Sequence, residues 1–255
     1  MVGGRRPLSA PGAQGEVGNN IERNSMLGYY RALFSTNTPV DFVHIDEIGR
    51  KPYKLIILPY PLMISQRAAQ TLVDFVRGGG ALVSEARLGW NDERGRAKDV
   101  IPGFGLNEVC GCRETAIQTT PSGKVDVDVG FKGFVYQESL DGNAIAHFAD
   151  GSNAIVTNNF GKGRMMTIGT FLGTAYEADR DEKLGNFIRG LLDWAGVKRG
   201  PEAPVEIRTL GDVTFAFNHG DAPVDVRLAG VDLETGVEMD HKVVQSGDVW
   251  VLRRR

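Results

Sequence analysis

Four polar or aromatic residues lie at or just beyond the ends of two apolar runs of the chain and could line a binding site. The runs LIILP (55–59) and ALVSE (81–85) are typical of parallel strands that are buried on both faces. Open α/β sheets bind their ligands beyond the carboxyl ends of such strands. The residues at these ends predict a candidate pocket that comprises Tyr60, Glu85, Arg87 and Trp90. The competing interpretation is structural, with a Glu85–Arg87 salt bridge and Trp90 packed in the core or in an interface.

Nucleophiles near this edge lack the sequence context that they need. Ser84 ends the second apolar run, but the G-x-S-x-G pattern of a serine nucleophile elbow is absent around it. Cys110 and Cys112 come later in the chain, and a reactive thiol needs an activating neighbour. We therefore expect Ser84 to be a small residue at a strand end, and both cysteines to be free thiols in the core. No catalytic residue is predicted.

The chain shows no pattern for a metal ion or a cofactor. The histidines lack metal-ligand spacing and are scattered over predicted strands and loops, at His44, His147, His219 and His241. Gly161-Lys162-Gly163 lacks the flanking residues of a phosphate-binding loop, which favours a hairpin turn. Asp92 and Glu93 could serve as paired carboxylates for glycoside hydrolysis, but a solvated loop is the simpler interpretation.

The composition indicates a globular protein. A chain of 255 residues can form one large domain or two modest ones. The net charge of −3 offers no electrostatic footprint for nucleic acid. No apolar stretch approaches the roughly 18 residues of a membrane span. Two free cysteines and the lack of a signal-peptide pattern in residues 1–20 favour a cytoplasmic location.

The first forty-five residues predict an arm, a helix and a strand. Residues 1–20 lack periodicity and read as an extended arm. A helix is expected over residues 23–35, with Asn24 or Ser25 as its cap, and a strand over residues 40–45. The apolar stripe of this helix is expected to contain Met26, Tyr29, Tyr30, Leu33 and Phe34.

The next segment predicts a strand, a helix and a second strand. The strand at 55–59 is followed by Ser65, which can cap a helix, and Gly78-Gly79-Gly80 can end that helix. The strand at 81–85 follows directly. Short connections between these elements indicate a right-handed βαβ unit and therefore a doubly wound α/β sheet.

The remainder of the chain predicts two further regions. Residues 113–170 alternate between apolar and polar positions and indicate an antiparallel insertion that returns to the sheet. A helix over 181–195 precedes a Gly-Pro linker. The predicted domains are an α/β domain over 21–199 and a small β-sandwich over 204–255, after the arm.

Short motifs also occur in a characteristic order. They are Val40-Asp41-Phe42-Val43, Tyr53-Lys54-Leu55-Ile56-Ile57-Leu58-Pro59, Gly79-Gly80-Ala81-Leu82-Val83, Pro102-Gly103, Gly111-Cys112-Arg113-Glu114 and Phe160-Gly161-Lys162-Gly163-Arg164. In this order they resemble the middle, trimerisation domain of the β-galactosidases of glycoside hydrolase family 42. Phe217-Asn218-His219 and Asp232-Leu233-Glu234-Thr235-Gly236 are similar to the small C-terminal domain of that family. The resemblance covers residues 21–252.

The resemblance implies a fold and a role. The fold would be a flavodoxin-like, class I glutamine amidotransferase-like doubly wound sheet with antiparallel additions, followed by a small all-β sandwich. The role would be that of a non-catalytic oligomerisation and accessory region of a β-galactosidase-like glycoside hydrolase in carbohydrate metabolism. A homo-oligomer, trimer or dimer, is the expected assembly, with contacts that involve residues 1–45.

Two parts of the family pattern are missing from this sequence. They are the catalytic barrel and the apolar first strand before the first helix. The sequence therefore suggests a truncated gene product or one piece of a split enzyme, with a separate catalytic barrel chain as a candidate partner.

Other functions stay open. A small hydrolase or a carbohydrate-binding protein could use the candidate pocket. Amidotransferases of this fold place a cysteine on the turn after the strand, where this chain has Ser84-Glu85-Ala86-Arg87. Sugar binding by the C-terminal sandwich would need surface aromatics, and Trp250 alternates with apolar residues as a core residue does.

Overall fold

The computed structural model describes residues 20–200 and 205–254, and these form two compact units. Unit 1 comprises the described residues up to Tyr30 together with Phe42–Val197. Unit 2 comprises Arg31–Asp41 and the described residues from Lys198 onward. The arm that we predicted over residues 1–20 lies, except for Asn20, outside the described residues.

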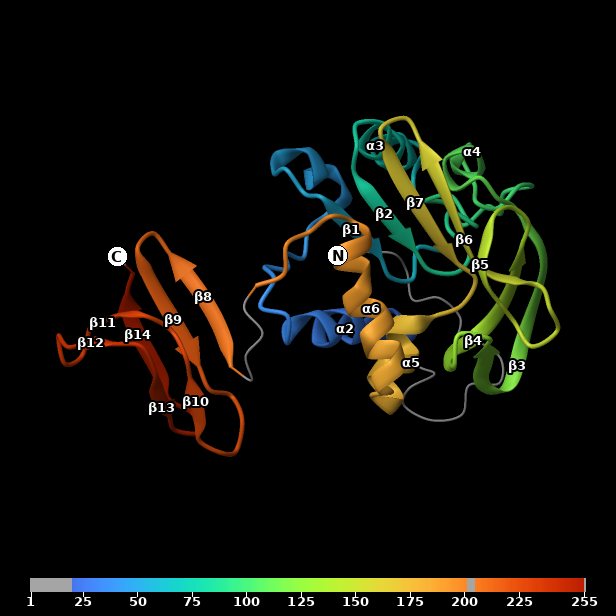
Figure 1. Ribbon diagram of the computed structural model, residues 1–255. Helices are drawn as coiled ribbons and strands as arrows, with labels where there is room; N and C mark the ends of the chain where they lie inside the picture. Colours follow the sequence, from blue (N-terminus) through green and yellow to red (C-terminus); the bar gives the residue numbers. More distant parts are fainter. Residues whose placement is uncertain (1–19, 201–204, 255) are drawn as a thin grey trace. The chain divides into compact units, whose positions relative to one another are not determined.

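A mixed seven-stranded sheet forms the centre of unit 1 (Figure 1). Its strands follow the order β1-β2-β7-β6-β4-β3, and β5 pairs with β6. The bounds are Leu55–Leu58 for β1, Ala81–Ser84 for β2, Glu114–Val127 for β3, Phe131–Leu140 for β4, Ala144–His147 for β5, Asn153–Phe160 for β6 and Gly163–Ile168 for β7. The strands β1, β2 and β7 are parallel, whereas β6, β4 and β3 pair antiparallel. The predicted α/β sheet with antiparallel additions is confirmed.

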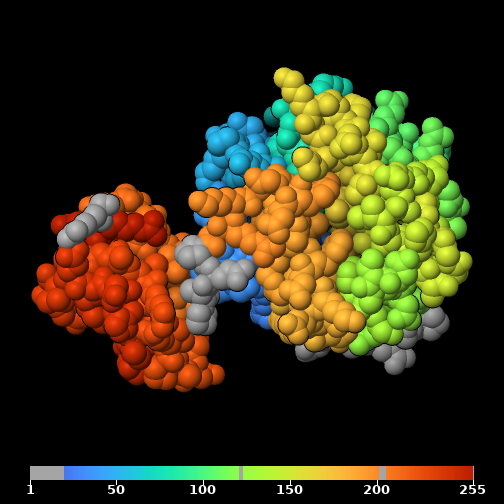
Figure 2. Space-filling model, in the orientation of Figure 1, coloured from blue at the N-terminus to red at the C-terminus, as the bar shows by residue number. Residues whose placement is uncertain are grey.

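Helices cover this sheet. They are α2 (Ile21–Phe34), the 3-10 helix η1 (Ile45–Arg50), α3 (Gln66–Arg77), α4 (Leu106–Cys110), α5 (Leu172–Asp179) and α6 (Glu182–Trp194). Figure 1 shows α3 and α4 together on one side of the sheet, with α5 and α6 grouped away from them. In Figure 2, α6 (orange) covers part of the visible face of unit 1, beside the yellow-green antiparallel strands. The inner parallel strands β2 and β7 are thus almost fully buried, whereas β1 at the edge of the sheet stays partly exposed.

A helix cap, a buried apolar face and a glycine turn form the β1-α3-β2 segment, as its sequence predicted. The Ser65 hydroxyl accepts a hydrogen bond from the Ala68 backbone N–H at 3.1 Å and caps α3. Leu72 and Val76 are fully buried on the inner face of the helix. Gly79 then adopts φ = 118°, where a side chain would be strained, and the chain turns into β2.

The inner face of α2 agrees with the predicted one at Tyr29 and Leu33, which are buried, but differs at two other positions. Ser25 is buried inside the helix rather than at its cap, and Met26 remains 37% exposed. The cause is a close approach of α2 and α5, because a Cβ atom on Gly28 would lie only 1.8 Å from the Gly173 carbonyl oxygen. Two glycines therefore decide which face of α2 is buried.

The strand that we predicted over residues 40–45 does not form. The chain is irregular up to His44, whose Nδ1 atom accepts a hydrogen bond from the Asp46 N–H at the start of η1. Residues of high β-propensity form a strand only beside a partner, and among the described residues no strand pairs with this segment. Phe42 stays 59% exposed, with its ring against that of Tyr30.

Unit 2 is a small β-sandwich, as predicted. One sheet has the order β12-β11-β14-β9-β8, and the other pairs β10 with β13. The bounds are Glu206–Leu210 for β8, Val213–Phe217 for β9, Val224–Val226 for β10, Gly230–Asp232 for β11, Glu238–Met239 for β12, Lys242–Val244 for β13 and Val249–Arg253 for β14. Trp250 is buried in the core between the sheets, which confirms its expected place. The strands β11, β12 and β13 are too short for an alternating pattern to indicate them.

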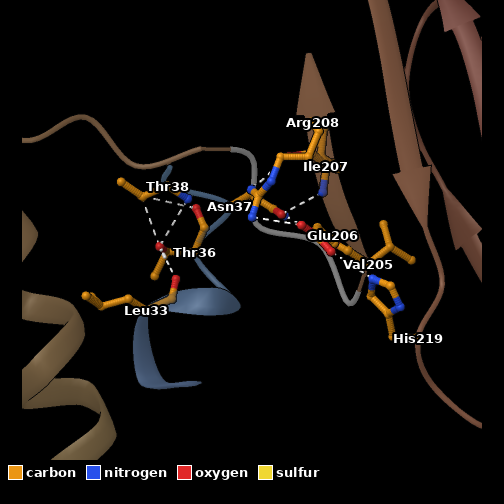
Figure 3. Close-up of polar contacts among 9 residues, drawn as sticks. All are labelled: Leu33, Thr36, Asn37, Thr38, Val205, Glu206, Ile207, Arg208 and His219. Carbon is orange, nitrogen blue, oxygen red and sulfur yellow. Dashed lines mark hydrogen bonds and ion pairs between the residues drawn. The ribbon is translucent and has the colours of Figure 1, made fainter. Parts of the chain in front are cut away.

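A segment from early in the chain belongs to this sandwich (Figure 3). The Asn37 side-chain amide donates to the Val205 carbonyl oxygen at 3.0 Å, and its oxygen accepts the Ile207 N–H at 2.8 Å. Asn37 has φ = 48°, a conformation that asparagine tolerates better than most residues. Thr36 supports this turn by donating to the Leu33 carbonyl oxygen at 2.6 Å. Side-chain pairing with β8 therefore joins residues 31–41 to unit 2.

Candidate functional site

The carboxyl ends of β1 and β2 bring the predicted pocket residues to one edge of the sheet. Leu58 pairs with Ser84 at these ends, so that the chain after each strand enters the same region. The Tyr60 N–H donates to Glu85 Oε2 at 3.2 Å. Tyr60 and Arg87 have φ values of 55° and 61°, which mark sharp turns after both strands.

Glu85 occupies the centre of this edge and is sealed from solvent. Its carboxylate accepts hydrogen bonds from the Ser25 hydroxyl, the Tyr60 N–H and, at 2.8 Å, the Gly173 N–H at the start of α5. Burial raises the pKa of Glu85 to about 7, although these hydrogen bonds favour the ionised form. The same burial, together with the neighbouring Glu85 carboxyl, raises the pKa of Tyr29 well above its usual value.

Arg87 does not form the expected salt bridge with Glu85. Its guanidinium instead binds Glu114 in a bidentate manner, with Nε–Oε2 at 2.8 Å and Nη2–Oε1 at 3.2 Å. The Trp90 ring lies on the other side, with its centroid 3.9 Å from Arg87 Cζ, in a cation–π arrangement. The Arg87 N–H donates to Glu138 at 2.7 Å. Arg87 and Trp90 thus contact each other directly. The hydrogen-bond partners of Arg87 are Glu114 on β3 and Glu138 on β4, and not Glu85.

Several residues of this edge were not indicated by the sequence. Glu138 is fully buried, and this burial raises the pKa of its carboxyl well above the usual value. The Phe171 ring packs between Tyr60 and Tyr136, with centroid distances of 5.3 and 5.5 Å. Tyr136 and Glu138 lie on β4, and the alternation of that strand was the one signal that could have placed them on a common face.

Ser84 and Glu85 at this edge are hydrogen-bonded to other groups of the protein. The Ser84 hydroxyl donates to the Glu85 carbonyl oxygen at 3.0 Å and is buried, so Ser84 is not an exposed nucleophile. Both oxygens of Glu85 already accept protein donors. Within residues 20–200 and 205–254, no cluster of three or more His, Cys, Asp or Glu side chains could hold a metal ion. In the same residues, no helix is long and apolar enough to cross a membrane.

The described residues thus form a mixed α/β domain, with this hydrogen-bonded edge, and a small β-sandwich. Known β-galactosidase structures have the same fold. That of Bacillus circulans sp. alkalophilus matches with a TM-score of 0.77 at 20% identity, over 92% of this chain and 38% of that one. A family 42 β-galactosidase called Gan42B matches with a TM-score of 0.76 at 22% identity, over 95% and 38%.

The sequence comparison identifies the family. The β-galactosidase trimerisation domain matches residues 14–198, and the chain belongs to that family. The β-galactosidase LacZ of Heyndrickxia coagulans is 27% identical over 218 residues, which are 77% of this chain and 31% of that protein. BgaH of Haloferax lucentense is 25% identical over 243 residues, or 90% and 35%. The chain thus spans about a third of the length of these relatives.

Proposed function

We propose that this chain is an oligomerisation and accessory module of a β-galactosidase-like glycoside hydrolase, and that it assembles as a homotrimer or a homodimer. The match of residues 14–198 to a trimerisation domain carries the proposal. Glycoside hydrolysis needs two carboxylates placed across the scissile bond. In the relatives most of the polypeptide lies outside the matched part, and we propose a separate catalytic barrel chain as a partner.

An open sheet edge supports self-association. The strand β1 ends the sheet, and among the described residues no strand pairs with its outer side. Leu55, Ile57 and Leu58 remain partly exposed, whereas every residue of β2 is buried. Parallel strands are normally buried on both faces, and an open edge is a template for pairing with another chain. A second copy that covers β1 and the exposed Phe42 would complete the sheet.

The finer fold assignment rests on the same strands. We infer a flavodoxin-like, class I glutamine amidotransferase-like core from the parallel β1, β2 and β7 with helices on both faces. A further parallel strand beside β1, preceding α2, would complete such a sheet through a right-handed crossover. The amidotransferase chemistry does not follow, because the turn after β2 carries Glu85 and Arg87, which are bound to protein groups.

Light scattering on a calibrated sizing column tests the oligomer. We expect a mass of two or three chains at high protein concentration, and a strict monomer would refute the proposal. Phe42→Lys should weaken assembly, because Phe42 is 59% exposed and can accept a charge without unfolding the domain. Ile145→Lys is the matched control, since Ile145 is 47% exposed on β5, on the opposite flank of the sheet.

A second function is favoured by one observation at the edge of β1 and β2. A carboxyl with a pKa of about 7, such as that of Glu85, suits a general acid near neutral pH, but Glu85 is fully buried, so a substrate would first have to displace a group that covers it. A small hydrolase or a carbohydrate-binding protein would then use Tyr60, Glu85, Arg87 and Trp90. Turnover of nitrophenyl galactosides that disappears in Glu85→Gln would support this function. Absence of turnover by the folded protein would remove it.

A further inference from the structure

Three aromatic side chains at the carboxyl edge of β1 and β2 carry polar atoms that bind no other described residue. They are Tyr60 after β1, Trp90 after β2 and Tyr136 on β4, and we call them the aromatic edge. All three side chains are half-buried rather than sealed. Among the described residues, neither tyrosine hydroxyl and not the indole N–H has a hydrogen-bond partner. These groups can therefore bind a ligand without the loss of an existing bond.

Hydrogen bonds and ring contacts hold the aromatic edge together. The Gly89 N–H donates to the Pro61 carbonyl oxygen at 2.9 Å, so the loops after β1 and β2 run side by side. The Phe171 ring lies against both tyrosines of the aromatic edge, with centroid distances of 5.3 and 5.5 Å. Open α/β sheets bind their ligands at this edge. The three side chains thus share one region where such folds place a site.

A rigid ion pair borders the aromatic edge. The Arg87 guanidinium lies over the Trp90 ring, with Cζ 3.9 Å from the centroid, and two of its N–H groups bind Glu114. The side chains of this ion pair are 11% and 13% exposed, so they reach the surface. The guanidinium has more N–H donors than these two bonds use, and carboxylate oxygens accept more than one bond. The border therefore offers fixed donors and acceptors with little net charge.

Backbone strain also gathers at this place. Tyr60, Arg87 and Val135, which precedes the tyrosine on β4, have φ values of 55°, 61° and 66°. A β-branched residue in this region is a genuine outlier, and such strain clusters at functional sites. The Thr170 hydroxyl holds β4 there, since it accepts the Phe134 N–H at 3.0 Å and donates to the Phe134 carbonyl oxygen at 3.2 Å. Three strained positions thus support one surface.

The chemistry of this surface favours a neutral sugar ring. An anion would gain little from Arg87, because Glu114 already neutralises the guanidinium. Within residues 20–200 and 205–254, no cluster of side chains suits a metal ion. An entirely apolar ligand would remove water from the ion pair without replacing its hydrogen bonds. A pyranose has apolar C–H faces for the aromatic rings and hydroxyls that both donate and accept.

We propose that the aromatic edge, with Arg87 and Glu114, binds a neutral pyranose ring without changing it chemically. The sugar packs one C–H face on an aromatic ring, and its hydroxyls bond to the ion pair and to the tyrosine hydroxyls. This binding deepens the second function proposed above and rests on its carbohydrate-binding form. It needs only half-buried and surface groups, so the fully buried Glu85 does not have to be reached. The proposed oligomer does not depend on it.

Ligand-observed NMR of the full chain tests the proposal. Saturation transfer from the protein to methyl β-galactopyranoside and to methyl β-glucopyranoside measures contact with a neutral ring. We expect transfer to the ring protons of one or both sugars, and binding that saturates in a titration. Galactitol carries similar hydroxyls without a rigid ring and should receive little transfer.

Two variants and a matched control locate the contact. Trp90→Ala should weaken binding at least about tenfold, since it removes an aromatic face and the support of Arg87. Trp194→Ala is the control, because Trp194 is also half-buried and lies under an arginine, with Arg164 Cζ 5.8 Å from its centroid, but at the end of α6. It should bind as the wild type does. Tyr136→Phe keeps the ring and should weaken binding about 2–10-fold.

Several results would overturn the proposal. They are no transfer to either glycoside from the folded wild type, equal transfer to galactitol, or unchanged binding in Tyr136→Phe, which decides the matter even if Trp90→Ala fails to fold. A lower oligomer mass in Trp90→Ala, with no sugar contact in the wild type, would assign the edge to a second copy instead. Light scattering on the same samples separates the proposals, because an oligomer without sugar contact refutes only the sugar site.

Discussion

A buried carboxylate of unit 1, Glu85, and one of unit 2, Asp232, have contrasting surroundings. Glu85 in unit 1 is fully buried, and among the described residues no lysine, arginine or histidine forms an ion pair with it. Asp232 in unit 2 is equally inaccessible, but it accepts Lys242 Nζ and Trp250 Nε1, each at 2.9 Å. The Glu234 and Thr235 N–H groups bind it as well, at 2.8 and 2.9 Å.

This difference sets the protonation of the two groups. Burial raises the pKa of Glu85 to about 7. Burial would raise the pKa of Asp232 too, but the hydrogen bonds from Lys242, Thr235 and Glu234 outweigh it and hold that pKa far below its usual range. Neutral donors alone do not offset the loss of hydration, whereas an ammonium group with backbone donors does. The comparison predicts opposite responses of the two carboxylates to pH, and a larger loss of stability on mutation at Asp232.

Removal of Asp232 should have the largest effect. Asp232→Ala leaves the Trp250 N–H unpaired in the core and Lys242 without its buried partner, so β14 should lose about 3–5 kcal/mol of stability. Hydrogen exchange of the β14 amides, Val249–Arg253, measures this loss. Glu234→Ala is the control, because the Glu234 side chain is 82% exposed and its bond to Lys242 should contribute at most about 1 kcal/mol. Equal losses in both variants would contradict the central role of Asp232.

The pH dependence of Glu85 should be the next largest effect. Its folded-state pKa of about 7 lies above the ordinary value of 4.5, so the folded state binds the proton more tightly. The free energy of unfolding should therefore fall by on the order of 3 kcal/mol as pH rises from about 4.5 to about 7, and should then level off. Asp232 has the opposite sign, because its stabilisation is lost as pH falls through and below its ordinary pKa.

Urea titrations between pH 5 and pH 8 measure the Glu85 effect. Glu138 has a raised pKa as well, so the informative quantity is the difference between wild type and Glu85→Gln. This difference should change with pH in step with the ionisation of Glu85. Parallel stability curves for the two proteins would contradict the raised pKa.

Loss of a single donor to Glu85 should have the smallest effect. Ser25→Ala removes a hydrogen bond to a carboxylate and should cost about 1.5–3 kcal/mol at pH 8, where Glu85 is ionised, and about 1 kcal/mol at pH 5. Ser84→Ala is the matched control, since the Ser84 hydroxyl donates to the neutral Glu85 carbonyl oxygen at 3.0 Å. The cost of Ser84→Ala should be the same at both pH values. Thermal or urea unfolding of the two variants would show whether Ser25 alone responds to pH.

Patterns within short stretches predicted much of this architecture. The apolar run of β1, the Ser65 cap and the glycines after α3 identified the βαβ unit, because each acts through local backbone and burial preferences. The alternation around Trp250 indicated the sandwich. The strand predicted over residues 40–45 does not form because extended structure also needs a partner, and β-branched residues do not reveal one.

The candidate site was predicted less completely. Tyr60 and Glu85 meet as expected, since parallel strands end at one edge. Arg87 binds Glu114 instead of Glu85, and that pairing depends on β3, far along the chain from β2. Ser25 and the Gly173 N–H reach Glu85 through the close crossing of α2 and α5. Pairings between distant segments leave no local signal in the sequence.

The sequence by itself determined the β1-α3-β2 unit, because periodicity, caps and turn residues act over a few neighbours, and its ordered motifs determined the family. Tertiary structure alone decided that the pKa of Glu85 would be raised to about 7 and that Asp232 would stay ionised at neutral pH. Both are single carboxylates followed by turns in the sequence. Their charge states depend on which donors and cations the folded chain brings within hydrogen-bonding distance, and on how much water it removes.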